Sequence, residues 1–258
     1  MGNFKSVRLF LRVLLIAATL VLASTGAGVA REKPRVQPSV TVPPASVSSA
    51  ARSGASAAWS VASIGTIDGD VFRLALDAAG CAIRSGAIAA PSTLTVIDYS
   101  KPSTDKRLWV FDLQSHALLY EELVAHGKGS GENLATLFSN VPETHTSSLG
   151  LFLTDDTYVG KNGYSLRLNG LEEGFNDRAR ERAIVMHGAP YVSTDFAKAQ
   201  GRLGRSRGCP ALREGVVREV IDRVRGNGLV FAYYPDQKWL ESSRYLGDCA
   251  AADLKHSS

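Results

Sequence analysis

The middle of the chain alternates between short apolar segments and polar breaks. Three segments rich in Val, Leu, Ile and aromatic residues, 93–100, 107–113 and 117–125, are separated by the stretches KPSTDK and QSH. Short apolar runs between turn-forming residues are typical of strands joined by hairpins, so we predict an antiparallel meander here. Further strands are predicted at 150–156, 164–170, 183–188 and 229–234.

Two other segments have a helical period. Asp68 or Asp70 can cap a helix that runs to about Ala79, with Gly80 near its end and a further short turn to Arg84. A second helix is predicted in 212–226, because one face carries the apolar positions 212, 216, 217, 220, 221 and 224. Many short strands with few helices predict a mainly β fold, sandwich or barrel-like, with a few peripheral helices.

The first thirty residues have the layout of a secretory signal peptide. Lys5, Arg8 and Arg12 precede an apolar run from 13 to 23, and small residues follow to Ala30. The run is short for a membrane span, so we predict cleavage and no stable span afterwards, with an uncleaved signal anchor as the alternative. The expected location is outside the cytoplasm, in the periplasm or cell envelope.

The remaining chain divides by composition into three parts. Residues 31–58 are rich in Pro, Ser and Ala and predict a linker, residues 59–250 predict one folded domain, and residues 251–258 predict a polar tail. The signal segment holds three of the 29 Lys and Arg and none of the 25 Asp and Glu, which leaves a net charge of +1. This balance gives no reason to expect a nucleic-acid partner, and the sequence does not define the oligomeric state.

Three cysteines in an exported chain leave at least one thiol unpaired within the chain. Cys81 lies in a helical pattern where a buried cysteine is ordinary, and a Cys81–Cys249 disulfide is one alternative in an oxidising compartment. Cys209 lies in the stretch GRSRGCPALREG. It can be a nucleophile, half of a disulfide or a small buried apolar residue.

The residues around Cys209 suit a thiol nucleophile. Gly208 permits a tight turn, and the amides of Gly208 and Cys209 are candidate donors to an oxyanion, since Pro210 has no N–H. Arg205 and Arg207 would favour a thiolate, and His187, at the end of a predicted strand, is the candidate base.

Other chemistry has weaker support. A zinc site formed by His126, His187 and Cys209 would lack the paired short spacings of structural zinc sites, so we predict no metal. The glycine cluster at 125–133 lacks the ending of a phosphate loop, and no cofactor is expected. The charged run from Asp177 to Arg182 predicts a solvated face.

Several motifs in order give a resemblance to a known family. HG at 187–188 followed by SRGC at 206–209 resembles the HG…S-x-G-C signature of the YkuD-type L,D-transpeptidases of bacterial cell walls. The chain is more closely similar to the branch with a GCPA cysteine motif, which shares the segments VAHGKGSG, FSN, SSLGLF, GYSLRLNGLEEGFND, IVMHGAPYV and GRSRGCPAL. The resemblance covers about residues 70 to 235.

The resemblance implies specific roles. Cys209 would attack the amide before the terminal D-Ala of a peptidoglycan stem tetrapeptide, with His187 as the base and the backbone at Gly208 and Cys209 holding the oxyanion. Ser206 would orient the loop or the imidazole. The catalytic residues implied are Cys209, His187, Ser206 and Gly208. Our candidate substrate-binding residues are Arg207, Arg205, His126 and Gly188.

Two departures from the family pattern concern the substrate. Arg207 stands where many members have His or Asn, and Ala211 stands where many have an Arg that meets the substrate. Arg202, Arg205 or Arg207 would then supply that charge. Three functions remain open: a transpeptidase that forms 3→3 cross-links, an L,D-carboxypeptidase that hydrolyses the same acyl-enzyme, and a catalytically silent wall-binding protein. The expected partner in each case is a peptidoglycan peptide stem.

Overall fold

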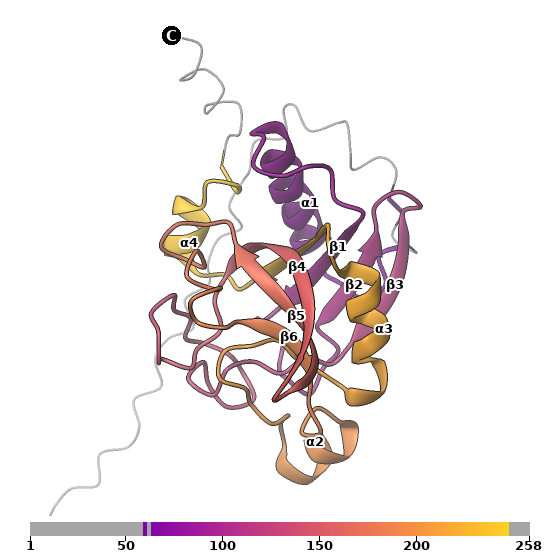
Figure 1. The fold of residues 1–258 in the computed structure, drawn as a ribbon, viewed down its shortest axis with the longest axis vertical. Coiled ribbons are helices and arrows are strands. Elements are labelled where there is room, and N and C mark those ends of the chain that lie inside the picture. The colour runs from indigo at the N-terminus through magenta and orange to yellow at the C-terminus, as the bar shows by residue number, and fades with distance from the viewer. Residues whose placement is uncertain (1–58, 61–62, 248–258) are drawn as a thin grey trace, which may run out of the picture. The chain divides into compact units, whose positions relative to one another are not determined.

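The computed structural model describes residues 59–60 and 63–247 (Figure 1). The predicted signal peptide, linker and polar tail lie outside these residues, and so does Cys249. In the part of the chain that is described, no helix is both long and apolar enough to cross a membrane.

One eight-stranded sheet forms the centre of the domain, in the order β3-β2-β1-β8-β4-β5-β6-β7. The first three strands pair antiparallel in sequence order, which confirms the predicted meander. The strands are β1 (Thr93–Asp98), β2 (Leu108–Asp112), β3 (Ala117–Glu122), β4 (Gly150–Gly160), β5 (Gly163–Gly170), β6 (Val185–Gly188), β7 (Ala211–Leu212) and β8 (Gly228–Tyr233).

The last strand, β8, joins the two halves of the sheet. It pairs parallel with β1 and antiparallel with β4. Its residues from 228 to 232 are buried, as expected for a strand covered on both faces.

The sheet nearly closes into a barrel. Its two edge strands are β3 and β7, and the chain just after β3 reaches β7 through a bridge between Ala125 and Ala211. The fold is therefore mainly β and barrel-like, as predicted, and the two edges meet two residues after Cys209.

Helix α1 (Gly69–Arg84) begins as predicted and ends later. The Asp68 side chain accepts hydrogen bonds from the amides of Asp70 and Val71. The helix continues past Gly80 because its buried face continues through Cys81 and Ala82. The predicted end at Gly80 is therefore wrong, and tertiary packing outweighs the low helix propensity of glycine there.

Three further helices of the described residues lie around the sheet. Helix α3 (Glu214–Val224) packs the predicted apolar positions 216, 217, 220, 221 and 224 against β6, β1 and β5, whereas Leu212, predicted to be helical, lies in β7. Helices α2 (Thr194–Gln200) and α4 (Gln237–Ser242) were not predicted, because they are short and have no sustained apolar period. Helix α1 packs against β1 and β8, and Figure 1 shows it in the upper part of the view, with α2 at the bottom.

Cys81 forms a disulfide. The other predicted half, Cys249, lies outside the described residues, so the Cys81–Cys249 pairing stays a prediction. Cys209 is a free thiol.

Candidate active site

The loop that carries Cys209 is held against a second loop by two glycines. Gly208 has φ +119°, and a Cβ there would lie 2.7 Å from the carbonyl oxygen of Thr146. A Cβ on Gly127 would lie 2.8 Å from the Cα of Gly208. Two backbones can approach this closely only without side chains, which explains the glycines in AHGKGSG and SRGC.

Backbone hydrogen bonds lock the two loops together. The amide of Ser206 donates to the carbonyl of His126 (2.9 Å), and the amide of Lys128 donates back to the carbonyl of Ser206 (2.8 Å). The amide of Ala125 then donates to the carbonyl of Ala211 (2.9 Å). The glycine cluster at 125–133 therefore fixes the cysteine loop at the closure of the sheet.

Ser206 is buried and shapes the turn before the cysteine. Its Oγ donates to the carbonyl of Cys209 (2.6 Å) and accepts from the amide of Gly208 (3.1 Å). Of the two roles predicted for Ser206, these contacts support orientation of the loop.

These contacts also change the predicted oxyanion hole. The amide of Gly208 already donates to the Ser206 hydroxyl, so it is not free for an oxyanion in this arrangement. Among the described residues, the amide of Cys209 donates to no backbone carbonyl, and its hydrogen bond is to the sulfur of Cys209 itself. It is the one of the two predicted donors that remains available.

Cys209 is a buried thiol, with 8% of its surface exposed. Its Sγ lies 3.7 Å from the carbonyl oxygen of Ala183. Burial raises the pKa of the Cys209 thiol, while hydrogen bonding to the backbone of Val185 and the charge of Arg182 lower it. Reactivity therefore depends on the nearby groups that stabilise a thiolate.

His187 lies on β6 beside the chain that follows Cys209. It pairs in register with Ala211, and its amide donates to the carbonyl of Pro210 (3.4 Å). Its Nδ1 lies 2.8 Å from the carbonyl oxygen of Gly188. A proton on Nδ1 satisfies that carbonyl and leaves Nε2 as a proton acceptor. Burial lowers the pKa of His187, which keeps the imidazole neutral, as a base requires.

Gly188 packs closely against helix α3, which leaves no room for a side chain. A Cβ at this position would lie 2.9 Å from Cγ1 of Val217 on α3. Within the described contacts it supplies the carbonyl that orients His187, and its predicted contact with substrate stays a prediction.

The predicted arginines have different surroundings. Arg205 donates to the carboxylate of Glu132 (2.6 Å) and to the carbonyl of Gly131 (2.9 Å), and Arg202 forms a second ion pair with Glu132 (2.9 Å). These two arginines tie the cysteine segment to the neighbouring loop. Arg207 is exposed and has no ion pair with any described residue, so it remains the freest charge for a substrate carboxylate.

Arg182 is a site residue that the sequence analysis missed. Its Nη2 donates to the carbonyl of Thr146 (2.7 Å), its Nη1 to the carbonyl of Ser139 (2.7 Å), and Nη2 lies 3.5 Å from the Cβ position of Gly208. The predicted solvated face is therefore wrong at Arg182. Arg178 and Arg180 do pair at the surface, with Glu181 and Asp155, and nothing in the charged run distinguishes Arg182 from them.

His126 is fully buried, with 0% of its surface exposed. Its Nδ1 lies 2.8 Å from Nη2 of Arg107, and its pKa is lowered to about 4 by burial and by this guanidinium. The ring is therefore a neutral partner of a buried arginine. This arrangement does not support the predicted contact with substrate, which would require the loop to move.

Arg107 is the centre of that buried cluster. Its guanidinium donates to the carbonyls of Val124 (2.9 Å) and Lys101 (2.8 Å) and lies 5.2 Å from the ring centroid of Tyr99. Burial lowers the pKa of Arg107 to about 10. Over the described residues, no group of three His, Cys, Asp or Glu side chains is placed to hold a metal ion.

Comparison with known proteins identifies the family of the domain. The family model described as the L,D-transpeptidase catalytic domain matches residues 64–233. No curated protein sequence matches the chain.

Solved structures of low identity are similar to part of the chain. An L,D-transpeptidase from Mycobacterium smegmatis is 14% identical, with a TM-score of 0.36, covering 56% of this chain and 59% of that one. The helical cell shape determining protein Pgp2 (K307A mutant) from Campylobacter jejuni is 14% identical, with a TM-score of 0.37, covering 55% and 47%. L,D-transpeptidase 3 from Mycobacterium tuberculosis is 11% identical, with a TM-score of 0.35, covering 56% and 62%.

The chain therefore spans less than two thirds of each of these structures, and likenesses this weak carry no statement about activity. The family model, by contrast, covers most of the described domain. This chain belongs to the L,D-transpeptidase catalytic domain family.

Proposed function

We propose that the protein is a cysteine-dependent L,D-transpeptidase that joins peptidoglycan stems through an acyl-enzyme on Cys209. The donor is a stem tetrapeptide, and the acceptor is the amine of a neighbouring stem. The observation that supports this reaction best is a free thiol in a loop that two glycines fix, followed two residues later by the partner in register of a histidine whose Nδ1 is held by a carbonyl.

The chemistry has two stages. His187 Nε2 takes the thiol proton as Cys209 Sγ attacks the carbonyl carbon of the third stem residue, and the amide of Cys209 donates to the oxyanion. The bond to the terminal D-Ala then breaks, and the leaving amine takes the proton from His187. The acceptor amine next attacks the thioester, loses a proton to His187 and releases the thiol. The product is a 3→3 cross-link.

The proposed function also requires that the protein be exported from the cytoplasm. The stems lie outside the cytoplasm, and the basic, apolar and small-residue regions of 1–30 support delivery to the periplasm or cell envelope.

The test is mass spectrometry of the intact protein and of its products after incubation with a disaccharide-tetrapeptide. We expect a transient adduct on the wild-type protein and a cross-linked dimer of muropeptides. Cys209→Ala should give neither. His187→Gln should lower the rate of acylation at least about 100-fold, because general base catalysis contributes about that much.

Other products would point to the other functions. A trimmed tripeptide without a dimer would indicate an L,D-carboxypeptidase, in which water outcompetes the amine. A folded wild-type protein that binds the stem without adduct or product would contradict catalysis and favour the wall-binding alternative.

A further inference from the structure

Arg107 is a fully buried cation that binds neutral partners. It donates to the carbonyls of Lys101 and Val124 and to Nδ1 of His126, rather than to a carboxylate. Removing a charge from water costs free energy, and an apolar side chain would fill the same space at a lower cost. The guanidinium is therefore better explained by the groups that it holds than by packing.

The guanidinium fixes the protonation of the His126 ring. A guanidinium can only donate, so Nδ1 of His126, 2.8 Å from Nη2 of Arg107, is the acceptor and carries no proton. The proton of the neutral ring is then on Nε2, which donates to the carbonyl of Gly131 (3.4 Å). A second proton would set the N–H of the ring against an N–H of Arg107. The ring is therefore held in one tautomer and one charge state.

The other groups around the ring favour the same state. Two cations act on it, Arg107 from the residue before β2 and Arg205 from the cysteine segment, and its other polar neighbours are the backbone groups of Gly131 and Glu132. Arg205 donates to the same carbonyl of Gly131 (2.9 Å). Burial and the charge of Arg107 lower the pKa of His126 to about 4, which agrees with a ring that stays neutral.

The backbone that this pair holds is the support of the cysteine loop. The carbonyl of His126 accepts the amide of Ser206 (2.9 Å). The next residue, Gly127, packs so closely on the loop that a Cβ there would lie 2.8 Å from the Cα of Gly208. A turn of the His126 ring that shifts this backbone therefore also shifts the loop of Cys209.

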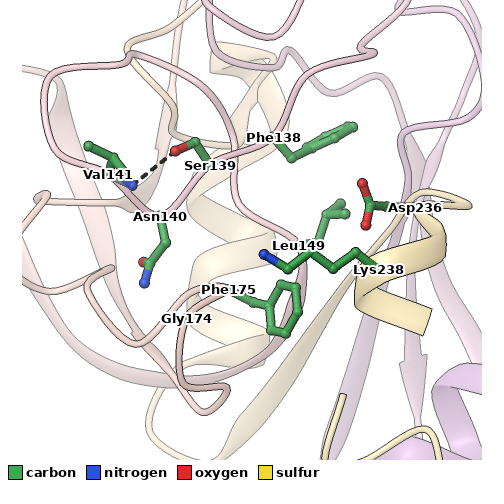
Figure 2. A pocket seen from close by; sticks show the side chains of 9 residues that line it. All are labelled: Phe138, Ser139, Asn140, Val141, Leu149, Gly174, Phe175, Asp236 and Lys238. Atoms are coloured by element: carbon green, nitrogen blue, oxygen red, sulfur yellow. Dashed lines mark hydrogen bonds between the residues drawn. The ribbon is translucent and has the colours of Figure 1, made fainter. Parts of the chain in front are cut away.

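The opposite side of Arg107 is packed less tightly. The guanidinium lies 5.2 Å from the ring centroid of Tyr99, and that ring lies 5.8 Å from the ring of Phe138. Phe138 lines a cavity of about 280 Å³, and Figure 2 shows the side chains around it. Space beside an aromatic ring allows it to shift. The side that holds the cysteine loop in place is therefore the side of His126.

We propose that Arg107 and His126 are positioning residues for the reaction at Cys209: Arg107 holds His126 as the neutral Nε2–H tautomer, and His126 holds the cysteine loop. Neither side chain touches the reacting atoms. The inference rests on the proposed function for the reaction itself, but the state of the ring can be measured without substrate.

The first measurement uses the wild-type full chain. Nitrogen NMR should show the His126 ring with a bare Nδ1 and a protonated Nε2 from about pH 8 down to about pH 5. The His126 signals are those that disappear in His126→Gln. A proton on Nδ1, or uptake of a second proton at about pH 6.5 as in an unperturbed histidine, would overturn the proposal whether or not any variant folds.

The second measurement compares two substitutions of the ring. His126→Leu removes both hydrogen bonds of the ring, whereas His126→Gln offers one acceptor and one donor without a charge at any pH. With a disaccharide-tetrapeptide, we expect acyl-enzyme to form about 10- to 100-fold more slowly in His126→Leu, because a small displacement of a nucleophile costs about that much. His126→Gln should be at least about fivefold faster than His126→Leu. Equal rates in the two variants would contradict a role for the hydrogen bonds.

Arg107→Met tests the other member of the pair. It frees Nδ1, so His126 should take up a second proton at higher pH than in the wild type, and acylation should slow by about 10- to 100-fold. Arg223→Met is the matched control, because Arg223 is half-exposed and pairs with Asp112 at the other end of β2. It should change neither result. A folded Arg107→Met protein with wild-type titration and wild-type acylation would overturn the proposal.

Alkylation of Cys209 by iodoacetamide separates this inference from the proposed function, because it needs no stem peptide. A displaced loop would take the thiol away from the backbone of Val185 and the charge of Arg182, which favour the thiolate. If no wild-type acyl-enzyme forms but alkylation slows from wild type to His126→Gln to His126→Leu, the positioning roles stand and the proposed reaction fails. If wild type and both variants are acylated and alkylated at equal rates, the reaction stands and the positioning roles fail.

Discussion

Arg182 is the cation that adjoins the cysteine loop, and its backbone contacts hold it there. It donates to the carbonyls of Ser139 and Thr146, so its position does not depend on a carboxylate partner. The arginines nearest to Cys209 in sequence instead pair with Glu132 or face solvent. Proximity along the chain is therefore a poor guide to which charge acts on the thiol.

Arg182→Gln should move the reactivity of Cys209 to higher pH. The charge of Arg182 lowers the pKa of a thiol that burial raises, so its removal raises that pKa further and reduces the thiolate fraction at neutral pH. We expect alkylation by iodoacetamide at pH 7 to slow by roughly 3- to 10-fold, with a midpoint at higher pH.

Arg180→Gln serves as the control, since Arg180 pairs with Asp155 at the surface and should leave the profile unchanged. An unaltered midpoint in Arg182→Gln would show that Arg182 only holds the loops in place.

At the scale of elements, the pattern of apolar residues predicts most of the sheet. The strands of the meander, β4, β5, β6, β8 and the face of α3 were predictable because each is several residues long and its apolar positions have a clear period. The two-residue strand β7 and the short helices α2 and α4 have no such signal. Their formation depends on partners that the fold brings together, such as the pairing of His187 with Ala211.

The residues of the candidate site also divide into those that a local motif indicates and those that depend on long-range contacts. Cys209, His187 and Ser206 are predicted site residues from local motifs; the structure joins Ser206 to Cys209 in one loop and pairs His187 with Ala211, two residues after that cysteine. Arg182 and the burial of His126 depend on long-range contacts, with Thr146 and Arg107 respectively, that no local spacing encodes.

The close contact between the loop of Gly127 and the cysteine loop predicts that a side chain at position 127 lowers stability. In Gly127→Ala, the new methyl group would lie 2.2 Å from the carbonyl oxygen of His145, so the loops must separate. We expect a loss of about 1–3 kcal/mol in the free energy of unfolding, measured by denaturant titration, and slower acylation.

Gly215→Ala makes the same chemical change in helix α3, where nothing lies within 4 Å of the new atom. It should leave stability equal or slightly higher. A Gly127→Ala protein as stable as wild type would contradict the close contact.

At the scale of the described domain, a buried carboxylate joins distant segments. Glu172 accepts from the amide of Leu151 on β4 (2.7 Å), from Nε1 of Trp239 on α4 (3.0 Å) and from the hydroxyl of Ser243. It thereby ties the end of the domain to the middle of the sheet. Burial raises the pKa of Glu172, and its hydrogen bonds oppose that shift.

Glu172→Gln should destabilise the protein by about 1–3 kcal/mol, because the new amide presents a donor to groups that themselves donate. The raised pKa also sets the sign of the pH dependence. The folded state binds the Glu172 proton more tightly, so this group adds stability as pH falls through its folded pKa. The difference between wild type and variant should therefore be larger at pH 5 than at pH 7 in thermal melts.

Glu173→Gln is the matched control, since Glu173 is exposed and should have little effect at either pH. A stability difference for Glu172→Gln that stays constant between the two pH values would contradict a raised pKa.

The bridge between Ala125 and Ala211 has a consequence for regulation of the whole domain. The two edges of the sheet meet through backbone bonds that flank the cysteine loop, so the closure of the barrel and the proposed site of acylation belong to the same part of the structure. A molecule bound across the contact between the two edge strands would stabilise the folded domain for as long as it stayed bound. Substrate supply would then govern how long each enzyme molecule survives, as well as how fast it works.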